Sequence, residues 1–241
     1  MKTRARPPAR DPIFGVPDTL PRGPHGLTRN QVAASQRARL QAALVEVVAA
    51  QGYPASTIAE ISRRAGVSPR TFYEHFQNKQ DCLFAAYDAF VDVLLTRMGA
   101  EVTPDTDWHE FITSALNGYL GTLEGDPVAA RAFLIEMEAA GPAARRRRRR
   151  AYEQFAELIK ARHDVIRRRD RSLAPLPDRV YLALAHGVRE LVCDALEASA
   201  RPRLRELGPD LLFWITATIR GAATAYEELD DAPPRAAAQR A

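Results

Sequence analysis

The sequence is poor in the features that mark secreted and membrane proteins. Only two cysteines occur, Cys82 and Cys193, and their spacing fits neither a disulfide nor a metal site. We therefore expect a reducing, cytoplasmic environment. The longest apolar stretch, residues 211–219, is too short to span a bilayer. The basic N-terminus lacks the apolar segment of a secretory signal.

Catalytic and metal-binding motifs are also lacking. No glycine-rich phosphate loop, nucleophile elbow or carboxylate pair stands out. The segment HEFIT at 109–113 places Thr113 where a zinc protease needs its second histidine. His163, His186 and Cys193 are typical of core or surface positions in helices. We therefore predict that the chain is not an enzyme and holds no metal or cofactor.

What the sequence contains is a sizeable apolar fraction and an uneven distribution of charge. Its 241 residues are 46% hydrophobic, which is sufficient for a real core. The first 80 residues hold 12 Lys/Arg against 5 Asp/Glu, and the remaining residues hold 22 against 25. A basic first third is typical of a nucleic-acid-facing end. A basic disordered tail without a partner is the alternative.

Helical periodicity follows the first 29 residues, and no convincing strand pattern occurs. We predict an all-α fold. The expected helices cover about residues 30–51, two short segments beginning near Thr57 and Ser68, a longer helix from about 79, and then 107–124, 127–139, 142–171, 177–199 and 209–229. Gly-Pro and Pro-rich segments separate the later helices.

Residues 57–79, TIAEISRRAGVSPRTFYEHFQNK, contain two very short helical patterns in succession. Thr57 has capping-box spacing to Glu60, Gly66 predicts a tight turn, and Ser68 followed by a proline predicts a second helix start. With the helix at 30–51 as a third wall, this is a helix-turn-helix arrangement. The predicted core consists of Leu44, Val48, Ile58, Ile61, Val67, Phe72 and Phe76.

Polar residues of the second short helix remain outside that core and are candidates for DNA contact. Arg70 can donate a bidentate pair to a guanine edge, and Ser68 and Thr71 can bond bases or phosphates. Tyr73, His75 and Lys79 are predicted to anchor the phosphate backbone. The full candidate set is Thr57, Ser68, Pro69, Arg70, Thr71, Tyr73, His75 and Lys79.

The stretch TIAEISRRAGVSPRTFYEHFQNKQDCL resembles the N-terminal domain of TetR-family transcriptional regulators, in which the pattern T…IA..AGVS…(L/F)Y.HF..K..L recurs. The resemblance covers about residues 33–85, and the remainder is similar only in length and helical texture. It implies a head domain that reads DNA, joined to a larger helical domain for ligand binding and dimerisation. It further implies that the candidate residues above lie at positions that commonly touch DNA.

We accordingly expect a homodimeric repressor that leaves a palindromic double-stranded operator when a small molecule binds. A ligand-responsive activator, and a helical binding protein whose head does not read DNA, are the alternatives. The expected domains are a disordered basic arm (1–29), a helix-turn-helix domain (30–77), a ligand-binding and dimerisation domain (78–231) and a frayed tail (232–241).

Two further residue sets are predicted within the larger domain. Apolar and aromatic residues at helical spacing can line a cavity for a lipophilic or aromatic effector. Candidates are Phe111, Tyr119, Phe133, Met137, Phe155 and His186. The resemblance assigns the last two helices to a dimer interface, against the alternative of packing within the chain. Its candidates are Val180, Leu184, Val188, Leu191, Leu211, Trp214, Ile215 and Ile219.

The run of six arginines at 145–150 is the strongest local charge feature. At about 100° per residue these side chains encircle a helix and cannot share one face. We predict a solvated helix start neutralised by Glu136, Glu138 and Glu153. An anion-binding site for a phosphate-bearing ligand is the alternative.

Overall fold

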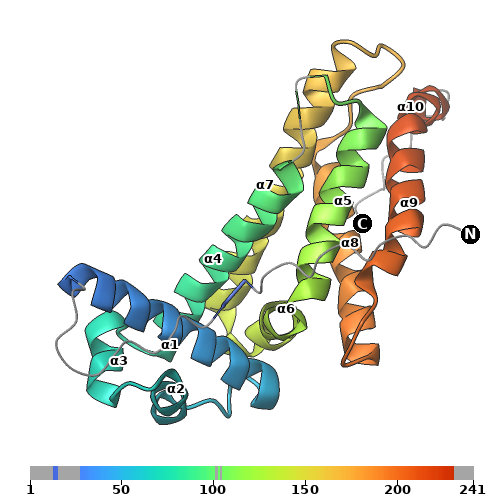
Figure 1. The fold of residues 1–241 in the computed structure, drawn as a ribbon. Coiled ribbons are helices and arrows are strands. Elements are labelled where there is room, and N and C mark those ends of the chain that lie inside the picture. Colours follow the sequence, from blue (N-terminus) through green and yellow to red (C-terminus); the bar gives the residue numbers. More distant parts are fainter. Residues whose placement is uncertain (1–12, 16–27, 101–102, 104, 231–241) are drawn as a thin grey trace, which may run out of the picture.

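The computed structural model describes residues 13–15, 28–100, 103 and 105–230, and these residues confirm the all-α prediction (Figure 1). The elements are α1 (Arg29–Gln51), α2 (Ile58–Ala65), α3 (Pro69–His75), α4 (Lys79–Gly99), α5 (Trp108–Gly125), α6 (Pro127–Leu134), the 3-10 helix η1 (Glu136–Ala140), α7 (Pro142–Arg167), α8 (Asp178–Ala198), the 3-10 helix η2 (Leu204–Leu207), α9 (Gly208–Arg220) and α10 (Ala222–Asp230). No helix in the described part of the chain is long and apolar enough to cross a membrane.

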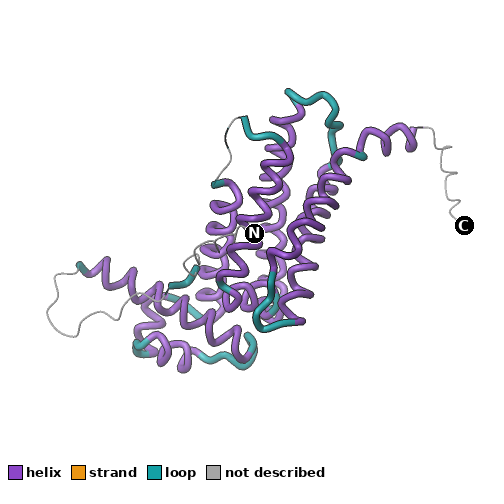
Figure 2. The backbone as a smooth tube through the Cα atoms, turned by 45° about the vertical axis from the view of Figure 1, so that its right-hand side comes forward, coloured by secondary structure: helices purple, strands orange, loops and turns teal. Residues whose placement is uncertain are grey.

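The molecule divides into a small head, α1 to α3, and a taller bundle, α4 to α10. Figures 1 and 2 show the head at one end, with α4 rising from it along the bundle. α4 packs on α1 in the head and on α5 and α7 in the bundle. At 21 residues and 1.5 Å per residue, α4 is about 30 Å long. One continuous helix therefore belongs to both parts.

The short helices of the head begin where the sequence predicts. The Thr57 hydroxyl accepts a hydrogen bond from the Glu60 backbone N–H at 3.2 Å, and the Ser68 hydroxyl accepts one from the Thr71 N–H at 3.1 Å. Gly66 between the two helices has φ +63°, in the left-handed region that favours glycine. The reciprocal half of the capping box does not form, because the Glu60 carboxylate accepts from the Gln51 amide at 2.8 Å instead.

The head core closes as predicted, and α1 supplies its third wall. The buried members are Leu44, Val48, Ile61, Phe72 and Phe76, while Ile58 and Val67 are half-buried. Arg39 of α1 is also buried, and its guanidinium donates to the carbonyl oxygen of Ala65, the last residue of α2. α1 therefore caps the C-terminus of α2 in addition to covering its apolar face.

Three predicted helices of the bundle are shorter than expected. The helix expected at 127–139 changes to a 3-10 turn after Leu134, whose carbonyl oxygen accepts from the Arg189 guanidinium of α8 at 2.6 Å. The helix expected at 142–171 ends at Arg167, and a turn closed by Asp170 follows it. The helix expected at 209–229 is interrupted at Gly221, between α9 and α10.

Residues 13–15 differ from the expected disordered arm at 1–29. The backbone N–H of Ile13 donates to an Asp126 carboxylate oxygen at 2.9 Å, and the Phe14 ring lies 5.8 Å from that of Phe133. Ile13 and Phe14 supply these contacts. Two apolar residues do not stand out in a basic, proline-rich segment, so its composition did not predict them. The rest of the arm up to residue 27 and the tail expected at 232–241 lie outside the described residues.

Three of the six consecutive arginines of α7 pair with different carboxylates, as their helical spacing requires. Arg148 pairs with Glu138, and Arg149 pairs with Glu153 at 3.0 Å, so two of the three predicted neutralising partners are confirmed. Arg147 makes an unpredicted contact with α4, where its Nε donates to Asp88 at 2.7 Å. The run therefore fastens the start of α7 to its neighbours.

Buried histidine and tyrosine side chains connect α7 and α8 near the far end of the bundle. His163 is 0% exposed, and its Nδ1 lies 2.7 Å from the Tyr181 hydroxyl. The Trp108 ring packs against His163 at 5.1 Å. Burial lowers the pKa of His163 below its ordinary value of 6.5, so this imidazole is neutral in the folded protein at neutral pH.

We expect Arg39→Met to lower the free energy of unfolding by about 1–3 kcal/mol, because it removes a donor from a buried carbonyl oxygen. The matched control is Arg64→Met. Arg64 pairs with Glu46 across the same two helices, but its side chain is 52% exposed, and such pairs contribute about 1 kcal/mol or less. Urea unfolding followed by circular dichroism measures both. Equal losses would show that the Arg39 contact is no stronger than a surface ion pair.

We expect His163 to make the folded protein sensitive to acid. Because the pKa of His163 is lowered in the folded state, the unfolded chain binds more protons than the folded chain at acidic pH. The free energy of unfolding therefore decreases as pH falls below about 6.5. Urea unfolding at pH 7.5 and 5.5 should therefore show a smaller loss for His163→Gln than for the wild type. His109→Gln changes an exposed histidine and should leave the wild-type dependence intact. An unchanged pH dependence in His163→Gln would contradict this assignment.

Candidate nucleic-acid interface and ligand cavity

The N-terminal half of α3 presents a polar edge to solvent. The Arg70 side chain is 88% exposed, and Tyr73 is 59% exposed. Ser68 and Pro69 are exposed at the start of the helix, and the half-buried Thr71 hydroxyl lies 3.0 Å from that of Ser68. The structure therefore brings these five predicted residues together on one edge of the head.

That edge also carries an acidic residue that the sequence analysis did not consider. Glu74 is exposed and lies 3.5 Å from the Arg70 guanidinium, one helical turn away. An exposed pair of this kind is weak and is easily exchanged for a stronger anionic partner. Arg70 is therefore free to swing toward a phosphate or a guanine edge.

His75, at the end of α3, faces α1 more than solvent. Its Nε2 lies 3.1 Å from the Gln36 side-chain oxygen, and the Arg37 guanidinium donates to its backbone carbonyl at 3.0 Å. The same guanidinium stacks over the Phe76 ring at 4.3 Å. Burial and the Arg37 charge lower the pKa of His75. The structure thus places His75 where it orients α3.

Lys79 and Thr57 are engaged within the head. The Lys79 ammonium donates to the carbonyl oxygens of Tyr53 and Ser56 at 2.6 and 2.7 Å and lies 4.1 Å from the centre of the Tyr53 ring. Burial lowers its pKa. The Thr57 hydroxyl is occupied as the cap of α2. No sequence pattern predicts the two carbonyl acceptors, because the loop conformation brings them to Lys79.

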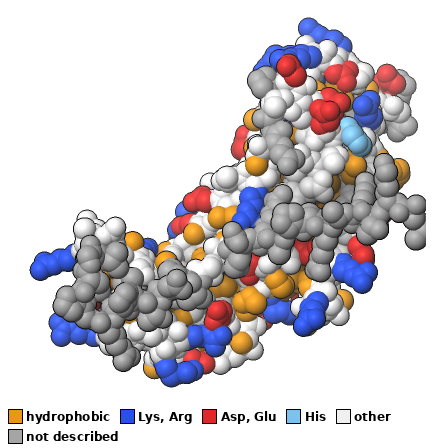
Figure 3. All heavy atoms as spheres, viewed as in Figure 1, with side chains coloured by type: hydrophobic (Ala, Val, Ile, Leu, Met, Phe, Trp, Pro, Cys, Tyr) orange, Lys and Arg blue, Asp and Glu red, His pale blue; other side chains and the backbone are white. Residues whose placement is uncertain are grey.

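Cationic side chains border the head more widely than α3 alone. Figure 3 shows Lys and Arg side chains along the outer edge of the head. Arg29, Arg63 and Arg64 of α1 and α2 are exposed in addition to Arg70. Such a distribution is compatible with contacts to the anionic phosphates of a nucleic acid.

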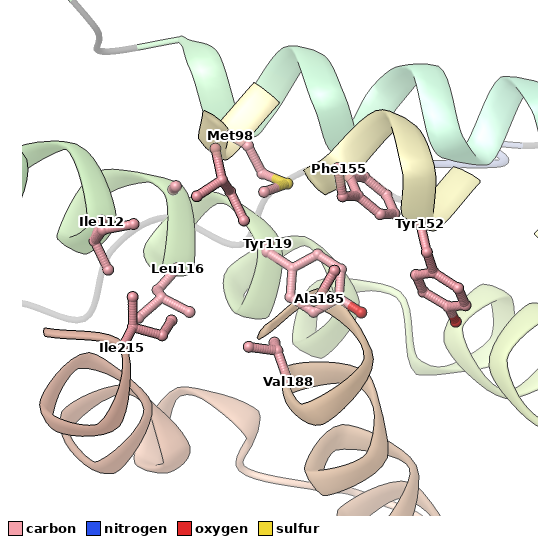
Figure 4. A pocket seen from close by; sticks show the side chains of 11 residues that line it. Met98, Ile112, Leu116, Tyr119, Tyr152, Phe155, Ala185, Val188 and Ile215 are labelled. Carbon is pink, nitrogen blue, oxygen red and sulfur yellow. The ribbon is translucent and has the colours of Figure 1, made fainter. Parts of the chain in front are cut away.

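A narrow apolar cavity lies inside the bundle, where five helices meet. Each helix contributes to its wall, as Figure 4 shows for Met98 of α4, Tyr119 of α5, Phe155 of α7, Val188 of α8 and Ile215 of α9. Its free volume is about 50 Å³. Sites for drug-sized ligands occupy about 300–1,000 Å³, so a ligand of that size requires these helices to move apart.

The predicted pocket residues divide between this cavity and the surrounding core. Tyr119 and Phe155 line the cavity. Phe133 packs instead against Phe90 of α4, with ring centroids 4.9 Å apart. His186 is exposed, and its ring centroid lies 4.6 Å from that of Tyr152. Phe111 and Met137 are buried and do not line it. Helical spacing alone does not distinguish a core position from a cavity wall.

The head is also the part of the chain that comparison with known proteins identifies. Residues 40–86 match the model of bacterial regulatory proteins of the tetR family. This match spans most of the head and the first residues of α4.

Individual relatives extend this similarity. An 84-residue stretch, 35% of this chain, is 30% identical to the fatty acid metabolism regulator protein of Bacillus subtilis, and a 91-residue stretch, 38% of this chain, is 31% identical to the HTH-type transcriptional activator FasR of Mycolicibacterium smegmatis. These matches span 43% and 42% of the two relatives. The crystal structure of FadR from Bacillus subtilis with stearoyl-CoA superposes with a TM-score of 0.63 at 21% identity, covering 72% of this chain and 94% of that one.

The residues predicted to form a dimer interface differ in exposure. Leu184, Leu211, Ile215 and Ile219 are at most 3% exposed, because α8 and α9 bury them within the chain. Leu191 and Trp214 remain 44% and 37% exposed, and Val180 and Val188 are half-buried. Phe213, which the sequence analysis did not select, is 76% exposed.

No cluster of three or more His, Cys, Asp or Glu residues suited to a metal ion occurs among the residues that the structure describes. Cys82 and Cys193 are both buried, and burial raises the pKa of the Cys193 thiol to about 11. This thiol is therefore protonated and unreactive at neutral pH.

We expect Lys79→Met and Arg70→Met to separate a supporting residue from a surface residue. Lys79→Met removes two hydrogen bonds inside the head and should lower the unfolding free energy by about 1–3 kcal/mol. Arg70→Met should change it by about 0.5 kcal/mol or less, because the side chain is exposed. Thermal and urea unfolding measure both. If Lys79→Met is as stable as the wild type, the Lys79 ammonium is free for other partners.

Proposed function

We propose that this chain is a DNA-binding transcriptional regulator whose operator affinity depends on an apolar ligand. The observation that carries the proposal is the solvent-facing edge of α3, in which Arg70 and Tyr73 project from a helix fixed at its far end by α1. A short helix held in this way can enter a major groove as a rigid reader. The tetR-family match over the head supports the same assignment.

We further propose that the regulator acts as a homodimer. Phe213, Leu191 and Trp214 are exposed apolar residues of α8 and α9, and these helices lie on the side of the bundle away from α3 (Figure 1). A second copy that covers these residues by two-fold symmetry would present two α3 helices to one duplex. A palindromic operator with half-sites about one helical turn apart would match such a dimer.

The ligand that we propose is a long-chain acyl compound held in the cavity of the bundle. The cavity wall is almost entirely apolar, and the solved Bacillus subtilis relative carries stearoyl-CoA. Because Met98 at one end of α4 lines the cavity and Lys79 at its other end supports the head, separation of the helices would tilt the head. A tenfold loss of operator affinity requires only about 1.4 kcal/mol of coupling free energy.

We propose that ligand binding releases the DNA, so that the protein acts as a repressor. One of the named relatives is an activator. Tighter DNA binding in the presence of ligand is therefore the competing outcome of the same experiment. A fluorescence anisotropy titration of operator-bound protein with an acyl-CoA distinguishes release from tighter binding.

DNA binding itself is tested with fragments from upstream of the protein's own and neighbouring genes, using scrambled DNA as competitor. We expect the logarithm of the affinity to fall linearly and steeply with the logarithm of salt concentration. Arg70→Ala should reduce the preference for operator over scrambled DNA by about 1–3 kcal/mol. Arg145→Ala, which removes the same charge from the exposed surface of α7, is the matched control and should leave the preference unchanged. If no upstream fragment outcompetes scrambled DNA, the proposed function is wrong.

A further inference from the structure

The cavity has a polar end that its apolar lining does not explain. Tyr152 of α7 lines the cavity and is 3% exposed, yet its hydroxyl donates no hydrogen bond within the described chain. The Arg189 guanidinium of α8 lies close enough to the Tyr152 hydroxyl to lower its pKa, its side chain is only 13% exposed, and its buried Nε has no acceptor besides that hydroxyl oxygen. A buried hydroxyl donor in the cavity wall therefore lies beside a buried guanidinium.

The position of Arg189 is fixed by its remaining donors. One terminal nitrogen donates to the Leu134 carbonyl at 2.6 Å, and the other donates to Glu190 at 2.9 Å. Glu138 lies 3.7 Å from the same guanidinium. Because these contacts hold the guanidinium plane, the Nε–H cannot turn to solvent without breaking them.

The surroundings of Tyr152 keep its hydroxyl protonated and therefore able to donate. Burial raises its pKa to about 12, although the charges of Arg189 and Arg148 act in the opposite direction. Figure 4 shows the hydroxyls of Tyr152 and Tyr119 toward the same end of the cavity, away from Met98 and Ile112. Burial also raises the pKa of Tyr119.

Buried donors without acceptors are rare in folded proteins, and their desolvation is offset when a ligand supplies the missing acceptor. An arginine Nε–H can only donate, and a protonated phenol beside an arginine donates most favourably to an oxygen atom. A carboxylate or an acyl carbonyl oxygen is the acceptor that an otherwise apolar molecule offers. An aliphatic chain without such an oxygen leaves the Tyr152 hydroxyl donor unsatisfied.

We propose that Tyr152 and Arg189 bind the acyl oxygen of the effector, so that the cavity selects carboxylic acids or their acyl derivatives over alkyl compounds of equal length. This inference rests on the proposed ligand response and specifies the recognition chemistry within that site. The apolar chain lies along the wall from Tyr119 to Met98, and the acyl oxygen lies at the α7–α8 end.

The test compares three probes on the full-length protein by isothermal titration calorimetry: palmitate, palmitoyl-CoA and its thioether analogue S-hexadecyl-CoA, which lacks only the carbonyl oxygen. We expect at least one acyl probe to bind the wild type about tenfold more tightly than the thioether. Tyr152→Phe should weaken that acyl probe about 3- to 10-fold and leave the thioether unchanged. Palmitate and palmitoyl-CoA together distinguish a free acid from a thioester as the natural class.

Tyr181→Phe is the matched control, because it removes a buried hydroxyl that bonds His163 outside the cavity. It should leave the affinities for all three probes unchanged. A second variant, Arg189→Lys, keeps the charge, removes Nε as a guanidinium donor, and should reproduce the selective loss of acyl affinity. Circular dichroism confirms that each variant is folded before titration.

Two results would overturn this inference. If Tyr152→Phe weakens acyl and thioether probes equally, or weakens neither, the hydroxyl does not read the acyl oxygen. If none of the probes binds while the protein still distinguishes operator from scrambled DNA, the acyl assignment fails and the DNA-binding function stands.

Discussion

The structure depends on one constraint: α2 and α3 are too short to be stable alone and must be held in place by α1. Helices of 8 and 7 residues bury little surface and satisfy few of their own terminal carbonyls. α1 provides an apolar wall and two arginines, of which Arg39 binds the end of α2 and Arg37 binds the end of α3. The free N-terminal half of α3 is thereby presented to solvent on a fixed base.

The second unifying element is α4, which connects this head to the cavity over about 30 Å. Lys79 at its start ties the α1–α2 loop, Asp88 near its middle pairs with Arg147 of α7, and Met98 near its end lines the cavity. In the proposed mechanism, this helix with contacts at both ends would convert a small separation of the bundle helices into a change of head orientation. The small free volume of the cavity makes such a separation a requirement for any sizeable ligand.

Polar contacts explain features of the bundle that the periodic spacing of apolar residues does not predict. The Arg189 guanidinium donates to the Leu134 carbonyl oxygen at the end of α6, and it also lies beside Tyr152 of the cavity wall. Arg147, Arg148 and Arg149, consecutive in sequence, pair with carboxylates of α4, of η1 and of α7 itself, because a helix distributes consecutive side chains around its axis. Packing and local pairing thus account for half of the charge run.

The sequence by itself determined the all-α class, the positions of the helix starts at Thr57 and Ser68, and the exposed edge around Arg70. These features depend on local chemistry, namely capping side chains, glycine at positive φ, and apolar spacing, which acts within a few residues. Only the tertiary structure decided that Lys79 and His75 support the head, that Leu211 and Ile219 belong to the chain's own core, and that Tyr152 rather than Phe133 lines the cavity. Each of these outcomes depends on atoms brought together from distant segments of the chain. A periodic pattern of apolar residues is the same for a core position, a cavity wall and an interface, so the pattern alone cannot distinguish them.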